Sequence, residues 1–385
     1  MSYDATDMFL TDEQKMLRDT VREFADAEVK PLAAQIDEEE RFPTETISKM
    51  AELGLLGICY DEKYGGAGMD TLSYIIAVEE LSRVCASTGI TLAAHISLGV
   101  GPIDLFGTDE QKEKYMPPLC SGEHLGAFGL TEPNAGSDAG GTETTAVLDG
   151  NEWVLNGSKI YCTNGSVAGT LVATAVTDKT KGTKGISSFI VETSNPGFSV
   201  GKRERKLGIK ASDTVMVHFT DCRIPKENIL GTPGEGFKQF LITLDGGRIS
   251  IGAMALGIAQ GAFEQSLQYS QERQQFGKPI AAFQTIQNKL ADMATEIEAA
   301  RHLVYHAARL KDAGKSYSRQ GAMAKLFASE VSMRVTNEAI QTHGGYGYVK
   351  EYPVERMFRD AKITTIGEGT SEIQKLVIAR NLLGR

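Results

Sequence analysis

The sequence lacks the common nucleotide-binding and hydrolytic motifs. It has no Walker A loop, no GxGxxG after a predicted strand, no GxSxG elbow and no HExxH pair. P-loop enzymes, Rossmann domains, α/β-hydrolases and zinc proteases are therefore poor interpretations of this chain. The loop YGGAG at 64–68 has glycines without the strand–helix setting of a dinucleotide fingerprint, and we predict a turn there.

Cysteine is scarce and shows no paired spacing. Five cysteines lie far apart in 385 residues, at positions 59, 85, 120, 162 and 222. This pattern is typical of reduced thiols in a cytosol-like compartment. His302 and His306 share a predicted helix face, but no third ligand accompanies them, so we expect no metal site.

Long apolar runs and leader features are also missing. No run approaches 18 apolar residues, so we expect no membrane insertion. The first ten residues, MSYDATDMFL, have no basic region and no apolar segment of the kind found in signal or transit peptides. We expect a cytoplasmic protein of bacterial type; a mitochondrial matrix protein would fit only if a presequence had been removed.

The composition is that of an acidic globular protein. A net charge of −10 and a pI near 5.3 argue against nucleic acid as the main partner. Hydrophobic residues make up 41% and charged residues 23%, which is ordinary for a folded domain. At this length the chain can form two or three domains with a substantial core.

The hydrophobic period changes twice along the chain and predicts three domains. Residues 1–125 are expected to be helical, beginning with a capping box at Thr11–Gln14. Residues 126–230 contain short β-rich runs between Asn-Gly, Asp-Gly and Pro-Gly turns, which predict a small barrel or sandwich. Residues 231–385 predict a bundle of long helices near 236–271, 283–311, 317–342 and 371–383. The expected fold class is α+β, mostly α.

Four segments are richer in glycine and small polar residues than packing requires. In Ile366–Thr370 (IGEGT), a carboxylate lies between two glycines, where a flat substrate can approach it and backbone N–H groups stay available. The alternative is a glycine turn before a helix that begins near Ser371. The other segments, each also compatible with a plain loop, are Phe128–Asp138, Ile160–Gly165 and Gln341–Gly347.

With Glu368, these segments make the chain similar to the acyl-CoA dehydrogenase family, end to end and in order. The matching motifs are LTEPNAGSDAGG at 130–141, LDGGR at 244–248, ERQQFGKPI at 272–280, QTHGGYGYVKEYP at 341–353 and DAKITTIGEGTSEIQ at 360–374. The resemblance implies an N-terminal helical domain, a middle β domain and a C-terminal four-helix bundle. It also implies FAD bound between the last two domains across a subunit interface, which needs no GxGxxG.

The resemblance assigns the cofactor contacts by motif position. Flavin and its pyrophosphate would meet Phe128, Leu130, Thr131, Gly136 and Ser137, with Tyr161 and Thr163 at the other edge of the ring. Residues that would reach the neighbouring subunit's cofactor are Arg273, Gln275, Phe276 and Gln284. Those that would meet pyrophosphate or adenosine, or complete the dinucleotide site, are Gln341, Gly344, Gly345, Thr370 and Glu372.

Substrate contacts are assigned in the same way. Residues that match contacts to pantetheine or the adenine nucleotide are Ser137, Asp245, Arg248, Gly369 and Arg380. An arginine suits a phosphate partner chemically. For Arg248, however, a helix ion pair with Asp245 at i,i+3 is an open alternative.

The resemblance implies FAD-dependent α,β-dehydrogenation of acyl-CoA thioesters to trans-2-enoyl-CoA, with electrons passed to electron-transferring flavoprotein. Glu368 would remove the α proton while the flavin accepts the β hydride. We expect an apolar pocket to raise the pKa of Glu368. Some branched-chain members carry the base at the position of Gly247 instead. Glycine there, together with Glu368, favours the usual arrangement.

The acyl group is predicted to be a short or medium straight chain. Gly367 stands where many straight-chain relatives have an aromatic residue, and its small size suggests a wider pocket. This leaves isobutyryl-, 2-methylbutyryl- and isovaleryl-CoA open as alternatives. An acyl-CoA oxidase would typically have a longer chain, and a non-catalytic FAD- or CoA-binding protein would have lost the base. A homotetramer is expected from the resemblance alone.

Overall fold

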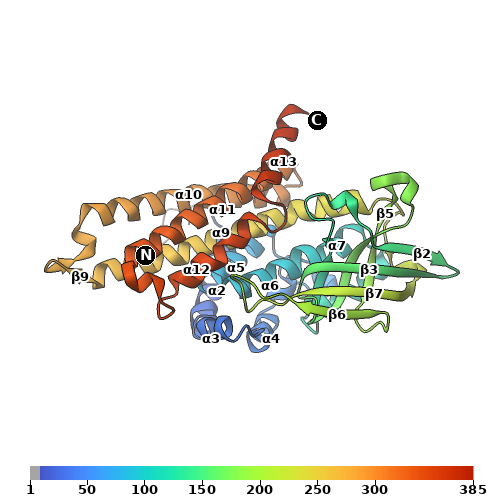
Figure 1. Ribbon diagram of the computed structural model, residues 1–385, viewed down its shortest axis with the longest axis horizontal. Coiled ribbons are helices and arrows are strands. Elements are labelled where there is room, and N and C mark those ends of the chain that lie inside the picture. Colours follow the sequence, from blue (N-terminus) through green and yellow to red (C-terminus); the bar gives the residue numbers. More distant parts are fainter. Residues whose placement is uncertain (1–8, 385) are drawn as a thin grey trace.

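The computed structural model describes residues 9–384, and the chain runs from helices through a sheet to a second set of helices (Figure 1). The first helices are α2 (Asp12–Phe24), α3 (Ala33–Glu38), α4 (Thr44–Glu52), α5 (Thr71–Val84), α6 (Ala86–Ala94), α7 (Gly101–Phe106) and α8 (Asp109–Cys120). The predicted capping box is formed: Thr11 Oγ1 accepts from Gln14 N–H at 3.2 Å, and Gln14 Oε1 accepts from Thr11 N–H at 3.1 Å.

Eight strands form the middle part. They are β1 (Leu125–Gly129), β2 (Thr145–Asp149), β3 (Glu152–Thr163), β4 (Ala168–Val176), β5 (Ile186–Glu192), β6 (Phe198–Arg203), β7 (Thr214–Pro225) and β8 (Ile229–Leu230). Their order is β6-β7-β3-β2-β4-β5-β8, and β1 pairs in parallel with β4. A single residue pair, Thr145 with Val176, joins β2 to β4. Trp153 on β3 and Phe189 on β5, which lie on opposite sides of this single link, pack in the same hydrophobic core, as in a sandwich or open barrel.

The β-rich runs predicted near 153–155, 171–176, 186–192 and 215–219 fall in β3, β4, β5 and β7, but β1, β2, β6 and β8 were not predicted. In β2 and in β6 most side chains are at least partly exposed, so neither of these two strands carries a hydrophobic alternation. Their pairing with β3 and β7 makes them strands. This is a tertiary effect that composition does not reveal.

The last part is built around a long central helix, α9 (Gly236–Glu272). The other helices are α10 (Gln284–Asp312), α11 (Ser318–His343), α12 (Val354–Ala361) and α13 (Ser371–Leu383), and a two-stranded hairpin joins β9 (Gln274–Gln275) to β10 (Lys278–Pro279). Two glycines let α5 pack closely against α9. A Cβ at Gly257 would lie 2.2 Å from Glu79 O, and one at Gly261 would lie 2.0 Å from Arg83 O. The first helices and the bundle therefore share one interface.

Two helical stretches are long and apolar enough to cross a membrane by length and composition alone. Ala86–Phe106 and Gly236–Glu272 each contain an 18-residue window with the hydropathy of a membrane span. In both, 72% of the window is buried inside the protein. This degree of burial is typical of core helices, so the two stretches are weak evidence for a membrane span.

A buried ion pair joins α5 to α10. Glu79 Oε1 accepts hydrogen bonds from Arg301 Nε at 3.1 Å and Nη2 at 3.0 Å, and Oε2 accepts from Tyr305 Oη at 2.7 Å. All three side chains are buried. Desolvation makes such a pair costly to form, and the loss of one partner leaves an uncompensated charge in the interior.

We predict that Arg301→Met lowers the free energy of unfolding by about 3 kcal/mol, because Glu79 keeps its charge without its partner. Thermal or urea denaturation followed by circular dichroism measures the loss. The double variant Glu79→Gln/Arg301→Met removes both charges and should recover more than half of it. Equal instability of the single and double variants would contradict the buried-charge explanation.

Candidate active site

Glu368 lies on the loop between the short turn Lys362–Thr365 and α13. Its backbone is left-handed, with φ +53°, and Gly369 follows with φ +97°. Thr370 then caps α13, because its Oγ1 accepts from Ile373 N–H at 3.4 Å. A positive φ at a non-glycine residue is strained and persists only where neighbouring contacts hold it. The segment is therefore both a helix-start turn and a strained position.

The carboxylate of Glu368 occupies space left by a glycine on α9. A Cβ at Gly247 would lie 1.8 Å from Glu368 Oε2, so no larger side chain fits there without moving the carboxylate. Oε2 itself is buried and accepts no hydrogen bond from any residue in the described range, 9–384. No described residue accepts a hydrogen bond from the backbone N–H of Glu368 either. The site thus presents an acceptor and a donor without protein partners.

Two buried cations lie near this carboxylate, Arg248 on α9 and Lys325 on α11. Burial raises the pKa of Glu368 to about 7, and the positive charges of Lys325 and Arg248 oppose part of that rise. The direction agrees with the sequence expectation. Arg248 pairs with Asp245, which also accepts from Ser318 Oγ at 2.9 Å. The i,i+3 ion pair that the sequence left open is therefore formed.

The loop after β1 is held by a second buried ion pair. Lys159 on β3 is fully buried, and its Nζ donates to Glu132 Oε1 at 2.6 Å and to Leu130 O at 3.2 Å. Glu132 accepts in turn from the N–H groups of Glu143 and Thr144. This pair fixes the loop at both ends, while Thr131, Gly136 and Ser137 stay at least partly exposed. Lys159 and Glu132 were not predicted from the sequence, where the available signal was a lysine within a β-rich run.

The end of β3 connects this loop to the surroundings of Glu368. Ile160 N–H donates to Thr131 O at 2.8 Å. Asn164 Nδ2 donates to Thr91 O on α6, and Tyr74 Oη on α5 donates to Ala93 O of the same helix. Burial, and to a smaller extent the charge of Glu368, raise the pKa of Tyr74. These contacts link the loop through β3 and α6 to Tyr74, which lies close enough to Glu368 for the two groups to influence each other electrostatically.

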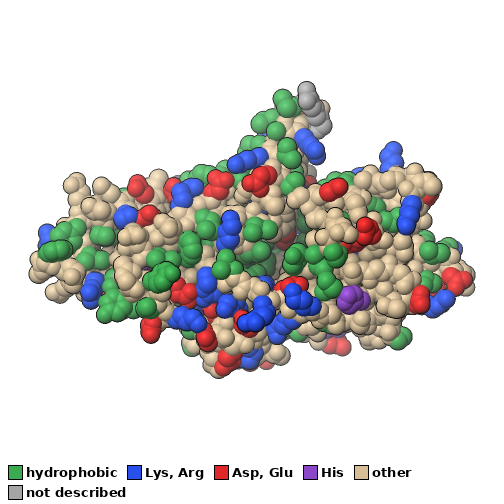
Figure 2. Space-filling view, viewed as in Figure 1, with side chains coloured by type: hydrophobic (Ala, Val, Ile, Leu, Met, Phe, Trp, Pro, Cys, Tyr) green, Lys and Arg blue, Asp and Glu red, His purple; other side chains and the backbone are tan. Residues whose placement is uncertain are grey.

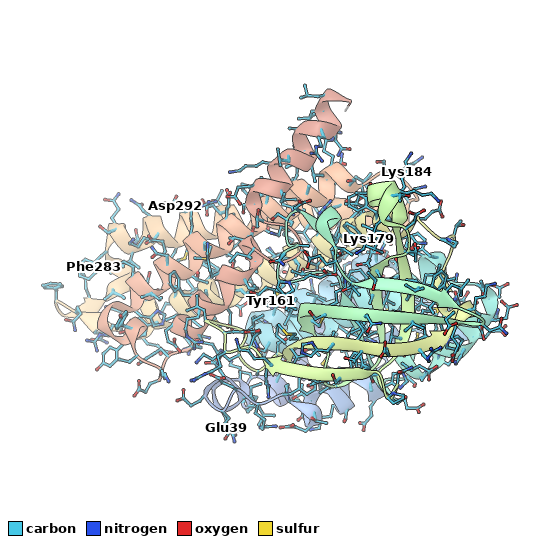
Figure 3. The ribbon with its side chains drawn as sticks, turned by 45° about the vertical axis from the view of Figure 1, so that its right-hand side comes forward. Glu39, Tyr161, Lys179, Lys184, Phe283 and Asp292 are labelled. Carbon is cyan, nitrogen blue, oxygen red and sulfur yellow. The ribbon has the colours of Figure 1, made fainter. Side chains whose placement is uncertain are left out.

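We call the sequence-predicted residues on the loop after β1, at the end of β3, on α9 and on the loop before α13 the central group. The group comprises Phe128, Leu130, Thr131, Gly136, Ser137, Tyr161, Thr163, Asp245, Arg248, Glu368, Gly369 and Thr370. Tyr161 is strained, with φ +58°, and 61% exposed near the middle of the molecule (Figure 3). Glu372 and Arg380 are exposed on α13, and Arg380 lies more than two helical turns beyond Glu372.

The other predicted cofactor contacts lie at the far end of the bundle. A cleft of about 730 Å³ brings together Arg273, Gln275, Gln341, Gly344 and Gly345. Tyr269 and His343 line the same cleft and stack with ring centroids 4.2 Å apart. Phe276 and Gln284 lie in and just after the β9–β10 hairpin, which Figure 1 shows far from β3. We call this set the distal group.

Comparison with protein families gives three matches that together span most of the chain. The acyl-CoA dehydrogenase N-terminal domain matches residues 11–123, the middle domain matches 127–222 and the C-terminal domain matches 234–383. The chain belongs to the acyl-CoA dehydrogenase family. The family resemblance, the α+β fold class and the assignment as an oxidoreductase are thereby confirmed. The boundaries at 125/126 and 230/231 stay predictions.

Individual members of the acyl-CoA dehydrogenase family match over nearly the whole length. The short-chain specific acyl-CoA dehydrogenase of Clostridium acetobutylicum is 58% identical over 373 residues, covering 97% of this chain and 98% of the relative. The structure of butyryl-CoA dehydrogenase from Megasphaera elsdenii is 50% identical, with a TM-score of 0.96 over 97% and 99% of the two chains. A chain from a structural study of the electron-transferring flavoprotein of Acidaminococcus fermentans is 53% identical, with a TM-score of 0.97 over both full lengths.

The raised pKa of Glu368 predicts a pH-dependent cost to stability. Between the ordinary value of 4.5 and about 7, the folded state holds a proton that the unfolded state releases. Stability from this group is therefore lost as pH rises through 7. We expect Glu368→Gln to stabilise the protein by roughly 2–3 kcal/mol at pH 8.5 and by much less at pH 5. Thermal melting at both pH values tests this, and an equal gain at both would contradict the raised pKa.

Proposed function

We propose that this protein is an FAD-dependent dehydrogenase that converts short-chain acyl-CoA thioesters to trans-2-enoyl-CoA and passes the electrons to electron-transferring flavoprotein. The observation that carries this proposal is the carboxylate of Glu368, whose buried Oε2 has no hydrogen-bond partner among the described residues and whose pKa lies near neutrality. Family membership and the named relatives support the reaction, the acyl length and the electron acceptor.

The central group fits FAD by the chemistry of its donors. Thr131, Ser137 and Thr163 offer hydroxyl groups that are not fully buried, and Tyr161 offers an exposed aromatic face. Phe128 and Leu130 add partly buried apolar surface for a ring system. When bound, FAD would supply the acceptor for the hydride that leaves the β carbon. The remaining chemistry belongs to the residues of this chain.

Glu368 is the proposed catalytic base for the α proton. A pKa of about 7 makes the carboxylate more basic than an ordinary glutamate, yet still ionised in a substantial fraction at neutral pH. The backbone N–H of Glu368 has no acceptor within the described range, so it can donate to the thioester oxygen, where enolate charge develops as the proton leaves. Gly247 keeps the space that the carboxylate needs.

A second copy of the chain would complete the cofactor site. The distal group lies away from the central group in the same chain: Figure 1 shows β9 at the opposite end of the molecule from β3, and Figure 3 shows Phe283 far from Tyr161. Phe276 in this group is strained and 93% exposed. Figure 2 shows α13 projecting from the body with hydrophobic side chains on its surface, and Leu376, Leu382 and Leu383 are exposed there. Exposed apolar surface of this kind marks an interface, and we propose a homotetramer in the cytoplasm of a bacterium.

We predict that Glu368→Gln binds acyl-CoA while the flavin stays oxidised, because the amide cannot take the α proton and keeps a similar shape. Anaerobic titration of the yellow protein with butyryl-CoA, followed by absorbance, measures the reduction. Bleaching at a rate within about tenfold of the wild type would reject Glu368 as the base.

The acyl preference forms a separate prediction. The relatives point to short chains, whereas Gly367 leaves open space: a Cβ there would meet only Ile363, at 3.5 Å or more. We expect highest kcat/KM for C4 to C6 substrates, with measurable turnover of isobutyryl- and 2-methylbutyryl-CoA. A profile over C4 to C12 and the branched substrates tests both parts. A sharp preference for butyryl-CoA alone would refute the widened pocket.

A further inference from the structure

Lys325 is a buried cation that the proposed chemistry does not yet use. It lies in the first half of α11, and its side chain is fully buried. Burial of an ammonium group is costly unless hydrogen bonds and opposite charge compensate it. Among the described residues, Nζ has one hydrogen-bond acceptor, the carbonyl oxygen of Gly369 at 2.7 Å. Burial lowers the pKa of Lys325 to about 8, and the charge of Glu368 acts in the opposite direction.

A second buried side chain binds the same stretch of backbone. Gln374, on the first turn of α13, donates from Nε2 to Gly369 O at 2.8 Å and to Glu368 O at 3.2 Å. Its side chain is also fully buried. A Cβ at Gly369 would lie 2.8 Å from this Nε2, so both the positive φ and the close approach require glycine. Two helices thus hold two successive carbonyl groups of the strained loop.

The geometry points to Lys325 as a positioning residue for Glu368, with its ammonium holding the backbone of the Glu368–Gly369 segment and supplying the positive charge that favours the ionised carboxylate. This inference rests on the proposed function for its catalytic consequence only. The electrostatic part concerns the folded protein and can be tested without turnover.

The other titratable groups around Glu368 contribute less than Lys325 to stabilising its ionised carboxylate. Arg248 on α9 is already paired with Asp245, so much of its charge is offset locally. Tyr74 on α5 is neutral near pH 7, because burial raises its pKa. Glu372 on α13 is exposed and screened by solvent. Lys325 has no hydrogen-bonded carboxylate within the described part of the chain, so its charge acts on Glu368 without a competing partner.

The consequence is a defined change in pH dependence. Removal of the Lys325 charge disfavours the ionised carboxylate, so the pKa of Glu368 rises further and less base is ionised at neutral pH. The acid limb of kcat/KM, meaning its rise with pH, reports the base of the free enzyme. That limb should therefore move to higher pH, and activity should recover when the pH is raised.

The experiment compares holoenzyme variants at matched FAD content. We expect Lys325→Met to move the midpoint of the acid limb upward by about one pH unit or more. Lys325→Arg keeps the charge and should stay within a few tenths of a unit of the wild type. Gln374→Leu is the matched control: it removes the neighbouring backbone contacts without a change of charge, so it should lower kcat and leave the midpoint in place.

A thermal measurement provides a readout without activity. In the Lys325→Met background, the stabilisation gained from Glu368→Gln should be larger at pH 7.5, where Lys325 of the wild type is still mostly charged, and should level off at a higher pH than in the wild-type background. If the wild type reduces no flavin with any acyl-CoA but this thermal coupling is present, the proposed function fails and the role of Lys325 stands.

Other outcomes of the same experiments would contradict the proposed role of Lys325. If Lys325→Met loses activity evenly at all pH values, with an unmoved acid limb and no thermal coupling, the inference is overturned and Lys325 serves folding alone. If Lys325→Met does not fold, Lys325→Gln replaces it, since glutamine removes the charge but can still donate to Gly369 O. An unchanged midpoint in Lys325→Gln would likewise overturn the inference.

Discussion

The site depends on one carboxylate in a packed bundle whose Oε2 is buried and has no hydrogen-bond partner among residues 9–384. Such a group is unfavourable by itself, and so is the left-handed backbone that carries it. The surrounding helices stabilise this arrangement: Gly247 leaves the space, Lys325 and Gln374 hold the backbone, and the cations nearby limit the electrostatic cost. A base of near-neutral pKa is the result.

This arrangement requires that separate parts of the chain be fixed against one another. Gly257 and Gly261 allow α5 to approach α9, and the Glu79–Arg301 pair joins α5 to α10. In the middle part, Lys159 and Glu132 fix the loop that leads toward the central group. Because each contact crosses between elements distant in the sequence, the position of Glu368 relative to that loop is a property of the whole chain. A base on rigid surroundings is better oriented than one on a free loop.

Much of the fold follows from local pattern. The long helices were located to within one or two residues, since their hydrophobic faces and end signals are strong, and the capping box at Thr11 was correct. Strands β1, β2, β6 and β8 were missed, and in β2 and β6 the reason is that most side chains are not buried. The apolar character of α9 was underestimated, because glycine and serine interrupt it.

For the site, the motif around Glu368 and the raised pKa of its carboxyl group were predicted from the sequence. The ion pair of Asp245 with Arg248 was one of two stated alternatives.

Order and spacing of motifs were enough to establish the family and to single out Glu368, because those signals are contiguous in the chain. The order of the motifs could not show which residues lie next to one another in the folded protein. Lys325 and Lys159 have the composition of ordinary surface lysines, and only folding buries them against Gly369 and Glu132. The tertiary structure also divided the predicted cofactor contacts into a central and a distal group. The reason is the length of α9 and α11, which keeps apart motifs that would have to lie side by side in a single ligand site.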